Sequence, residues 1–307
     1  MNSAMNFMNQ AITTKATRAA FFDVDETLIN TKSMFDFLRF WMARHGDDGS
    51  GHAAVMAGVR EAAASGVHRS EINRRYYRRF AGVPMEELRT AGREWYEEYR
   101  RGPAAVTVAT WAAASRHREA GDLVVLVSGS FRGCLDPLAE DLGADLILCS
   151  EPVVGPDGLL TGEVERPMIG SVKADAVRET LARLGLDAGE SSCYGDHASD
   201  LDMLLAVGRP VVVGGTDRVL MEHAQRLDWP VLPSAPGQLR TAGAWAAAEL
   251  TGLGPVVKLP SAGRRHARTL AAPAPDPSTS STGVWGRHAE STHLTPPGPP
   301  SGRTTAV

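Results

Sequence analysis

The sequence predicts a doubly wound α/β domain with a parallel sheet, an inserted all-helical block and a disordered C-terminal tail. Short apolar runs alternate with helical patterns over much of the 307-residue chain, as they do in parallel sheets. The stretch 33–121 carries only helical patterns, and the segment from about Ala271 is rich in Pro, Ser, Thr and Gly with almost no apolar periodicity. Such a tail buries too little surface to offset its ordering entropy.

The expected elements follow one another in α/β order. Strands are expected at 19–23, 123–128, 144–150, 191–195, 210–213 and, more weakly, 229–232. Helical periodicity occupies 131–142, 172–184, 201–207 and 219–227. A hairpin is expected where 151–154 and 159–164 flank a Gly-Pro-Asp-Gly turn. In such a fold, ligands bind at the carboxyl ends of the strands.

The helical block divides the chain into three expected parts. Residues 1–32 and 122–254 form the α/β core, because the first strand and the remaining α/β units lie on either side of the block. Residues 33–121 form an inserted helical cap, whose last part includes a helix that returns to the core. Residues 255–307 form the disordered tail.

Composition and charge restrict the classes of function. The chain is 43% hydrophobic, enough for a full core, and has no apolar stretch long enough to span a bilayer or to act as a secretory signal. We therefore expect a cytoplasmic protein without a membrane partner. The formal charge of -4 combines a tail of +4 from Pro255 onward with a body of -8. An acidic body argues against nucleic acid as the main partner.

The most informative motif lies at the end of the first strand, where Asp23 and Asp25 follow an apolar run. Alternate residues of a strand share a face, so both carboxylates point the same way if strand geometry continues past Asp23. Two like charges that close are tolerated when a cation lies between them or when one is protonated. Both conditions are typical of catalysis, although a strand that ends in a polar turn also places Asp there.

Three further motifs stand at element boundaries downstream. Ser128-Gly129-Ser130 follows the second strand, where a residue without a side chain lets backbone N–H groups approach an anion. Lys173, one of four lysines beside 28 arginines, begins a later helix and supplies a compact positive charge. Asp196 and Asp200 follow the fourth strand one helical turn apart, an arrangement suited to a hard cation. Together the four motifs indicate phosphate chemistry.

In these motifs the chain resembles the haloacid dehalogenase (HAD) superfamily, and within it the phosphoserine-phosphatase-like branch, subfamily IB, with a helical C1 cap. The resemblance covers about residues 19–232 and includes the hairpin that contains Leu160-Thr161-Gly162-Glu163. It implies a Rossmann-like core and a Mg²⁺-dependent phosphoric monoester hydrolase that works through an aspartyl-phosphate.

The resemblance also implies a role for each motif residue. Asp23 is the nucleophile, and Asp25 is the general acid and then the general base. The phosphoryl oxygens bind to Ser128, the Gly129 N–H and Lys173. The magnesium ligands and the acid that supports them follow: a carboxylate oxygen of Asp23, the backbone carbonyl of Asp25, a carboxylate oxygen of Asp196 and, behind them, Asp200.

A charge count supports the metal independently of the resemblance, because up to four carboxylates face one lysine at a site that must attract a phosphate dianion. The expected substrate is a small polar phosphomonoester: phosphoserine, histidinol phosphate, a sugar or aminocyclitol phosphate, or an intermediate of specialised metabolism. A phosphotransferase or mutase that uses the same aspartyl-phosphate, and a binding module without catalysis, are the alternatives. The sequence specifies no oligomeric state.

Overall fold

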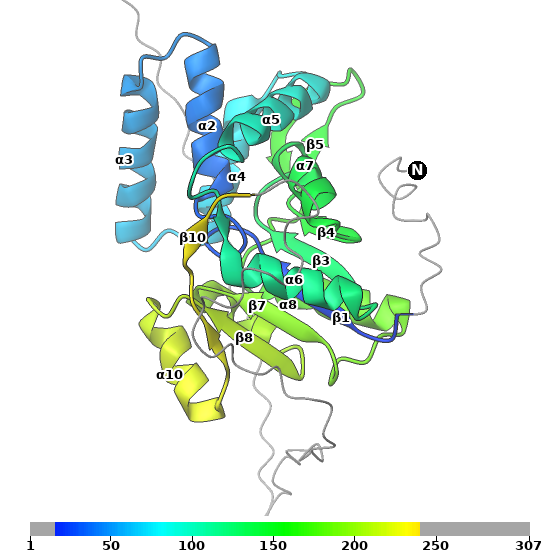
Figure 1. Ribbon diagram of the computed structural model, residues 1–307. Helices are drawn as coiled ribbons and strands as arrows, with labels where there is room; N and C mark the ends of the chain where they lie inside the picture. The colour runs from blue at the N-terminus through cyan, green and yellow to red at the C-terminus, as the bar shows by residue number, and fades with distance from the viewer. Residues whose placement is uncertain (1–15, 240–307) are drawn as a thin grey trace, which may run out of the picture. The chain divides into compact units, whose positions relative to one another are not determined.

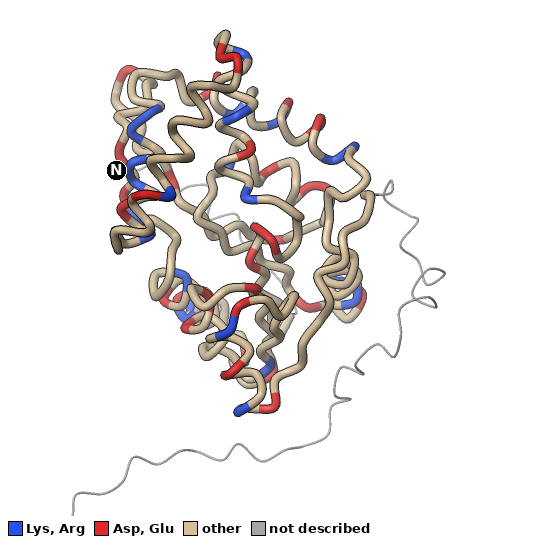
Figure 2. The backbone as a smooth tube through the Cα atoms, turned by 90° about the vertical axis from the view of Figure 1, so that its left-hand side faces the viewer, with Lys and Arg blue, Asp and Glu red and all other residues tan. Residues whose placement is uncertain are grey.

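The computed structural model describes residues 16–239. The expected disordered tail, 255–307, and residues 240–254 of the expected core lie outside the described residues, as do the first fifteen residues. In the described part of the chain, no helix is long and apolar enough to cross a membrane. Acidic and basic residues are interspersed along the described backbone (Figure 2).

The centre of the fold is a six-stranded sheet in the order β4-β3-β1-β7-β8-β9, with every neighbouring pair parallel. The strands are β1 (Ala19–Asp23), β3 (Leu123–Ser128), β4 (Leu146–Cys149), β7 (Ser192–Gly195), β8 (Arg209–Val213) and β9 (Val231–Leu232). Because β3 and β7 lie on opposite sides of β1, the strand order reverses beside β1. A ligand site is expected at the carboxyl ends of strands at such a reversal. The predicted α/β fold is confirmed.

Helices cover both faces of the sheet because β1 is apolar on both faces. Ala20 and Phe22 join one buried cluster, while Ala19 and Phe21 join the other, as strand alternation requires. The first cluster includes residues of α6 (Val108–Glu119) and α7 (Arg132–Leu142). The second includes residues of α8 (Ser171–Leu184), α9 (Leu201–Leu204) and α10 (Arg218–Leu227). The two layers and the sheet between them can be followed in Figure 1.

The helical block after β1 contains α2 (Ser33–Arg44), α3 (Ser50–Ala64), α4 (Arg69–Tyr77), the 3-10 turn η1 (Arg78–Phe80) and α5 (Met85–Tyr99). An aromatic cluster packs α2 against its neighbours, with the Phe37 ring 5.2 Å from that of Phe131 on the core side. In contrast, α3 has no buried residue and stands beside α2 at one side of the block (Figure 1).

The expected hairpin forms from β5 (Pro152–Val154) and β6 (Leu160–Val164). The stretch 33–121 also contains a feature that its helical pattern did not predict. The short strand β2 (Val106–Thr107) pairs in antiparallel fashion with β10 (Pro236–Gly237). A two-residue strand has no periodicity of its own, and its partner lies far away in the sequence.

The last helix of this stretch, α6, packs on the sheet and fixes the loop that follows the Asp23 motif. The Thr110 hydroxyl donates to the Thr27 carbonyl at 2.7 Å. The Trp111 indole N–H donates to the Leu28 carbonyl at 2.9 Å. The division into core and cap stays a prediction, but α6 has the position expected for a helix that returns to the core.

Candidate active site

The candidate site lies at the carboxyl ends of β1, β3 and β7, where a cavity of about 440 Å³ opens between the sheet and helices α2, α3 and α4. Seven predicted site residues line this one cavity: Asp23, Asp25, Ser128, Gly129, Lys173, Asp196 and Asp200. They come from four separate segments of the chain, and only the fold brings them together. Their individual roles stay predictions.

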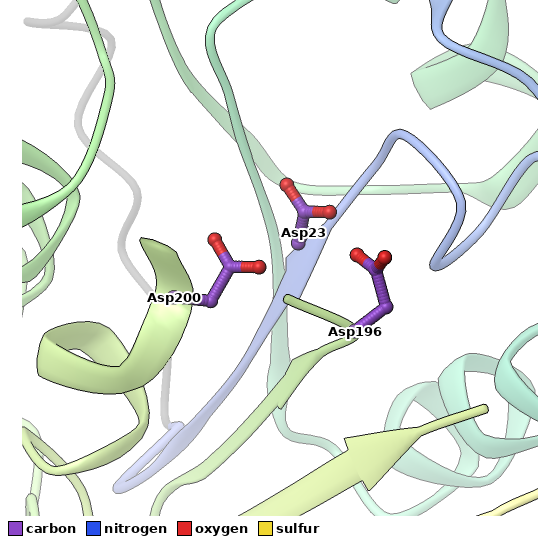
Figure 3. Close-up of side chains that lie close together, drawn as sticks. All are labelled: Asp23, Asp196 and Asp200. Atoms are coloured by element: carbon purple, nitrogen blue, oxygen red, sulfur yellow. The ribbon is translucent and has the colours of Figure 1, made fainter. Parts of the chain in front are cut away.

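Three carboxylates from three elements converge in the cavity. Oxygens of Asp23, Asp196 and Asp200 all lie within 4.8 Å of one another, and Figure 3 shows their side chains facing a common space. Asp23 ends β1, Asp196 follows β7, and Asp200 ends a 3-10 turn. Clustered carboxylate oxygens are ligands that hard divalent cations prefer, so the donor set fits Mg²⁺.

Glycine at position 195 permits this convergence. A Cβ atom placed there would lie 2.8 Å from the Cβ of Asp200, a distance that real side chains do not tolerate. The absence of a side chain therefore lets the turn that carries Asp200 approach the end of β7. Asp196 is in turn oriented by the Thr27 hydroxyl, which donates to its Oδ1 at 3.1 Å.

Lys173 joins two of the carboxylates. Its ammonium group donates to Asp23 Oδ1 at 2.5 Å and to Asp200 Oδ1 at 2.7 Å, and all three side chains are buried. Burial opposes the positive charge of Lys173, but Asp200 and Asp23 outweigh it and raise the pKa of the lysine. The lysine is therefore charged throughout the physiological pH range.

The pKa values of the carboxyl groups are raised by burial and by their neighbours' charges. Burial raises the pKa of Asp23 well above its usual range, with Asp200 and Asp196 adding to the effect and Lys173 opposing it. Burial, followed by the charge of Asp200, raises the pKa of Asp196 to about 6. One lysine does not neutralise this group, so a further cation at the site would stabilise its ionised form.

Asp25 is the second carboxylate of the motif that begins at Asp23. It follows β1 in a tight turn in which the Val24 carbonyl accepts hydrogen bonds from Leu28 and Ile29 N–H at 2.9 and 3.1 Å. Its Oδ1 accepts a hydrogen bond from the Ser33 N–H at 3.0 Å, which orients the carboxyl group. Burial raises the pKa of Asp25, and a raised pKa suits a carboxyl group that must carry a proton.

The Ser128-Gly129-Ser130 loop is held from two sides. Within the loop, the Ser130 N–H donates to Ser128 Oγ at 3.0 Å. From α4, Asn73 Nδ2 and the Tyr77 hydroxyl donate to the Gly129 carbonyl at 2.9 and 3.2 Å. A helix of the predicted cap thus fixes the loop that is predicted to bind phosphate.

Further residues border the cavity that sequence patterns did not identify, among them Arg69, Asn73 and Tyr76 of α4. Their spacing of four and three residues places them on one helical face. That spacing was visible in the sequence, but nothing in it distinguished a face that borders a cavity from one that packs in a core. Arg69 reaches across to the core, with Nη1 2.9 Å from His197 Nδ1 and 3.3 Å from Ser199 Oγ.

The fold and the site together define an α/β enzyme with an acidic pocket at the reversal of strand order. Residues 20–205 match the haloacid dehalogenase-like hydrolase family. The chain belongs to this family, and the predictions of the family and of a hydrolase are confirmed.

Similar proteins include two that are named as phosphatases. A Streptomyces azureus protein named for inhibition of morphological differentiation is 44% identical over 38% of this chain, a match that spans 42% of that protein. A probable phosphatase of Mycobacterium tuberculosis is 32% identical over 74% of this chain and 79% of its own length. A phosphoserine phosphatase of M. tuberculosis is 30% identical over 63% of this chain and 43% of its own length.

Solved structures show the same fold. A Bordetella pertussis protein of unknown function superposes with a TM-score of 0.61 and 27% identity, over 71% of this chain and 98% of that one. A phosphoserine phosphatase solved as a phospho-aspartyl intermediate analogue gives a TM-score of 0.53 at 19% identity, over 73% of this chain and 96% of that one. At this low identity, the second likeness concerns the fold alone.

Proposed function

We propose that the chain is a Mg²⁺-dependent phosphatase that hydrolyses a small phosphomonoester through an aspartyl-phosphate on Asp23. The observation that carries the proposal is the convergence of Asp23, Asp196 and Asp200 on one point, with Lys173 bonded to two of them. Relatives named as phosphatases support the same reaction class.

Asp23 is the proposed nucleophile because it is the carboxylate that Lys173 contacts at the end of the central strand. One of its oxygens would attack phosphorus in line as the bond from phosphorus to the leaving oxygen breaks. The contact with Lys173 opposes the effect of burial and favours the ionised form that attack requires. The product of this step is an alcohol and a phosphorylated Asp23.

Asp25 is the proposed proton donor and acceptor. In the first step its proton passes to the leaving alkoxide. In the second step it takes a proton from the water that attacks phosphorus, and the bond between phosphorus and Asp23 breaks to release inorganic phosphate. The Ser33 N–H keeps the Asp25 carboxyl oriented during both steps.

The remaining predicted residues bind the phosphoryl group and the metal. The hydroxyl of Ser128, the N–H of Gly129 and the ammonium group of Lys173 would bind phosphoryl oxygens, whose charge persists in the transition state. Carboxylate oxygens of Asp23 and Asp196 and the Asp25 carbonyl would hold Mg²⁺, with Asp200 in support. When bound, the ion would neutralise charge on the phosphoryl oxygens as a Lewis acid.

Helices α2 to α5 would act as the cap over this chemistry. Helices α2, α3 and α4 form one wall of the cavity, and closure would exclude water from the reacting groups. A cytoplasmic location and a small-molecule substrate complete the proposal.

Phosphate release from a panel of phosphomonoesters tests the reaction. We expect turnover with Mg²⁺, its loss in excess EDTA and its recovery when Mg²⁺ is added back. Asp23→Asn should abolish turnover, whereas Asp157→Asn, in the exposed hairpin turn, should leave it unchanged. Full activity in excess EDTA, or in Asp23→Asn, would refute the mechanism.

A further inference from the structure

The cavity has two chemically different ends. The end next to the sheet contains the carboxylates, Lys173 and the Ser128-Gly129 loop. The end formed by α2, α3 and α4 is lined by apolar side chains: Met34, Phe35, Val59, Ala63 and Ile72. The whole cavity has a volume of about 440 Å³, which lies in the range of pockets that hold drug-sized ligands. A phosphoryl group fills only part of this space, so the remainder is available to the alcohol part of the substrate.

Two buried residues that line the cavity each have a polar atom without a hydrogen-bond partner among the described residues. Asn73 and Tyr76 line the cavity and are each 4% exposed. Asn73 Oδ1 and Tyr76 Oη have no hydrogen-bond partner in the described part of the chain. The orientation of the Asn73 amide is fixed, because its Nδ2 donates to the Gly129 carbonyl. Oδ1 is therefore an acceptor, and leaving it unpaired costs free energy that a ligand hydroxyl would recover.

The charges around the cavity disfavour an ammonium group on the alcohol part. The charged lining residues from the cap helices and their N-caps are Lys32 and Arg69, both positive. Among the acidic lining residues, Glu26 is paired with Lys32, and the others surround the phosphoryl position. A zwitterionic amino acid would thus bring its ammonium group to a region that holds one ion pair, between Glu26 and Lys32, one further cation, Arg69, and no unpaired carboxylate.

Part of the apolar end is formed by α3, a helix without a buried residue. Val59 and Ala63 belong to α3, which has no buried residue. A ligand with an apolar body would therefore bury side chains of α3 that the free protein leaves partly exposed. Burial of this apolar surface would contribute to substrate binding.

We propose that the alcohol part of the substrate is an uncharged, mainly apolar group with a hydroxyl close to the phosphoester, rather than an amino acid. The apolar body lies against α2 and α3, and the hydroxyl binds Asn73 Oδ1 and the Tyr76 hydroxyl. The inference rests on the proposed phosphatase function and narrows the sequence-based expectation of a small polar metabolite.

Three alkyl esters with comparable leaving groups test the inference: 2-hydroxyhexyl phosphate, hexyl phosphate and O-phosphoserine. We expect kcat/KM with Mg²⁺ to be about tenfold higher for 2-hydroxyhexyl phosphate than for hexyl phosphate, because the second ester leaves the two polar atoms unpaired. Phosphoserine should be the poorest of the three. A higher kcat/KM for phosphoserine than for both hexyl esters would overturn the inference while leaving the phosphatase function intact.

Binding of the corresponding phosphonates, measured by calorimetry, separates the two proposals. Phosphonates cannot be hydrolysed, so their affinities do not depend on catalysis. If no ester is hydrolysed, the phosphatase proposal fails, and the phosphonates still decide the substrate class. Tighter binding of the hydroxyalkyl phosphonate than of the amino acid phosphonate supports the inference, and the opposite order overturns it.

One substitution and a matched control test where the substrate hydroxyl binds. Tyr76→Phe removes only the hydroxyl and should reduce the preference for 2-hydroxyhexyl over hexyl phosphate to about one- to threefold. Tyr96→Phe is the control, because Tyr96 is a buried cap tyrosine outside the cavity lining whose hydroxyl donates to Asp141 at 2.9 Å. An unchanged preference in Tyr76→Phe would contradict the assignment of the hydroxyl contact.

Val59→Ser tests the apolar wall. It should lower kcat/KM for hexyl phosphate severalfold relative to phosphoserine, because a polar group then faces the alkyl chain. Val55→Ser, one turn earlier on the same helix, changes a half-buried residue outside the lining and should not change this ratio. Equal ratios in both variants would refute the placement of the apolar body against α3.

Discussion

The two walls of the cavity are built in opposite ways. On the core side, Asp23, Lys173 and Asp200 are buried, and Lys173 donates hydrogen bonds to both carboxylates. On the cap side, α3 contributes Val59 and Ala63 to the lining but buries no residue. The groups proposed to react are therefore preorganised, while part of the apolar surface proposed to contact the substrate lies on α3, an element that can move at little cost.

Lys173→Met should produce the largest loss of activity, because it removes the cation that joins Asp23 and Asp200 on the core side of the cavity. The substitution keeps the length of the side chain but leaves Asp23 and Asp200 buried without their cation. We expect kcat/KM to fall about a thousandfold and the free energy of unfolding to fall by about 3 kcal/mol, measured by phosphate release and urea denaturation. Arg178→Met, on the exposed face of the same helix, is the control. Retention of activity within tenfold of the unsubstituted protein would contradict a preorganised Lys173.

Hydrogen exchange measures the contrast directly. Amides of α3 should open with a free energy several kcal/mol below that of β1, because α3 has no buried side chain whereas β1 is paired on both sides. Binding of an alkyl phosphonate should slow exchange in α3 and leave β1 unaffected. Equal protection of α3 and β1 in the free protein would remove the distinction between the two walls.

A smaller effect is expected at the one place where α4 holds the predicted phosphate loop. Tyr77→Phe removes one of the two side-chain hydrogen bonds to the Gly129 carbonyl, and Asn73 retains the other. The affinity for inorganic phosphate should fall about fivefold, the usual net value of one neutral hydrogen bond, as measured by product inhibition. An unaltered inhibition constant would show that the Tyr77 hydrogen bond does not position the loop.

The smallest expected effect is a dependence of stability on pH. It arises at His117 of α6, away from the candidate site. His117 is buried between Asp122 and the Tyr194 hydroxyl, with ring nitrogens at 2.7 and 2.9 Å from them. Burial lowers the pKa of His117, although Asp122 opposes the shift. The unfolded chain therefore binds a proton first as pH falls, so this contribution to stability is complete above about pH 6.5 and is lost below it.

His117→Gln should remove that part of the pH dependence. The slope of the unfolding free energy between about pH 6.5 and 5 would then become flatter than in the unsubstituted protein, as read from urea denaturation at several pH values. A steeper slope in the variant would show that the folded state favours the charged imidazole.

The sequence predicted the cavity residues that follow the strands far better than those on helices α2, α3 and α4. Strands β1, β3 and β7 are short runs that each end at a polar motif, so local pattern alone located Asp23, Ser128 and Asp196, and the parallel topology brought them together. The face of α4 that carries Asn73 and Tyr76 has no comparable signal. Whether a helical face borders a cavity depends on what packs against it, and the two-residue pairing of β2 with β10 depends on contacts between distant segments.

The most direct test of the account is to look for the aspartyl-phosphate. The protein is mixed with Mg²⁺ and a phosphomonoester that it hydrolyses. The mixture is quenched in acid within the first turnover and analysed by peptide mass spectrometry. The account predicts one phosphoryl group on the peptide that contains Asp23, absent from Asp23→Asn. Phosphate release in the same mixture with no phosphorylated Asp23 at any quench time, and undiminished in Asp23→Asn, would contradict it.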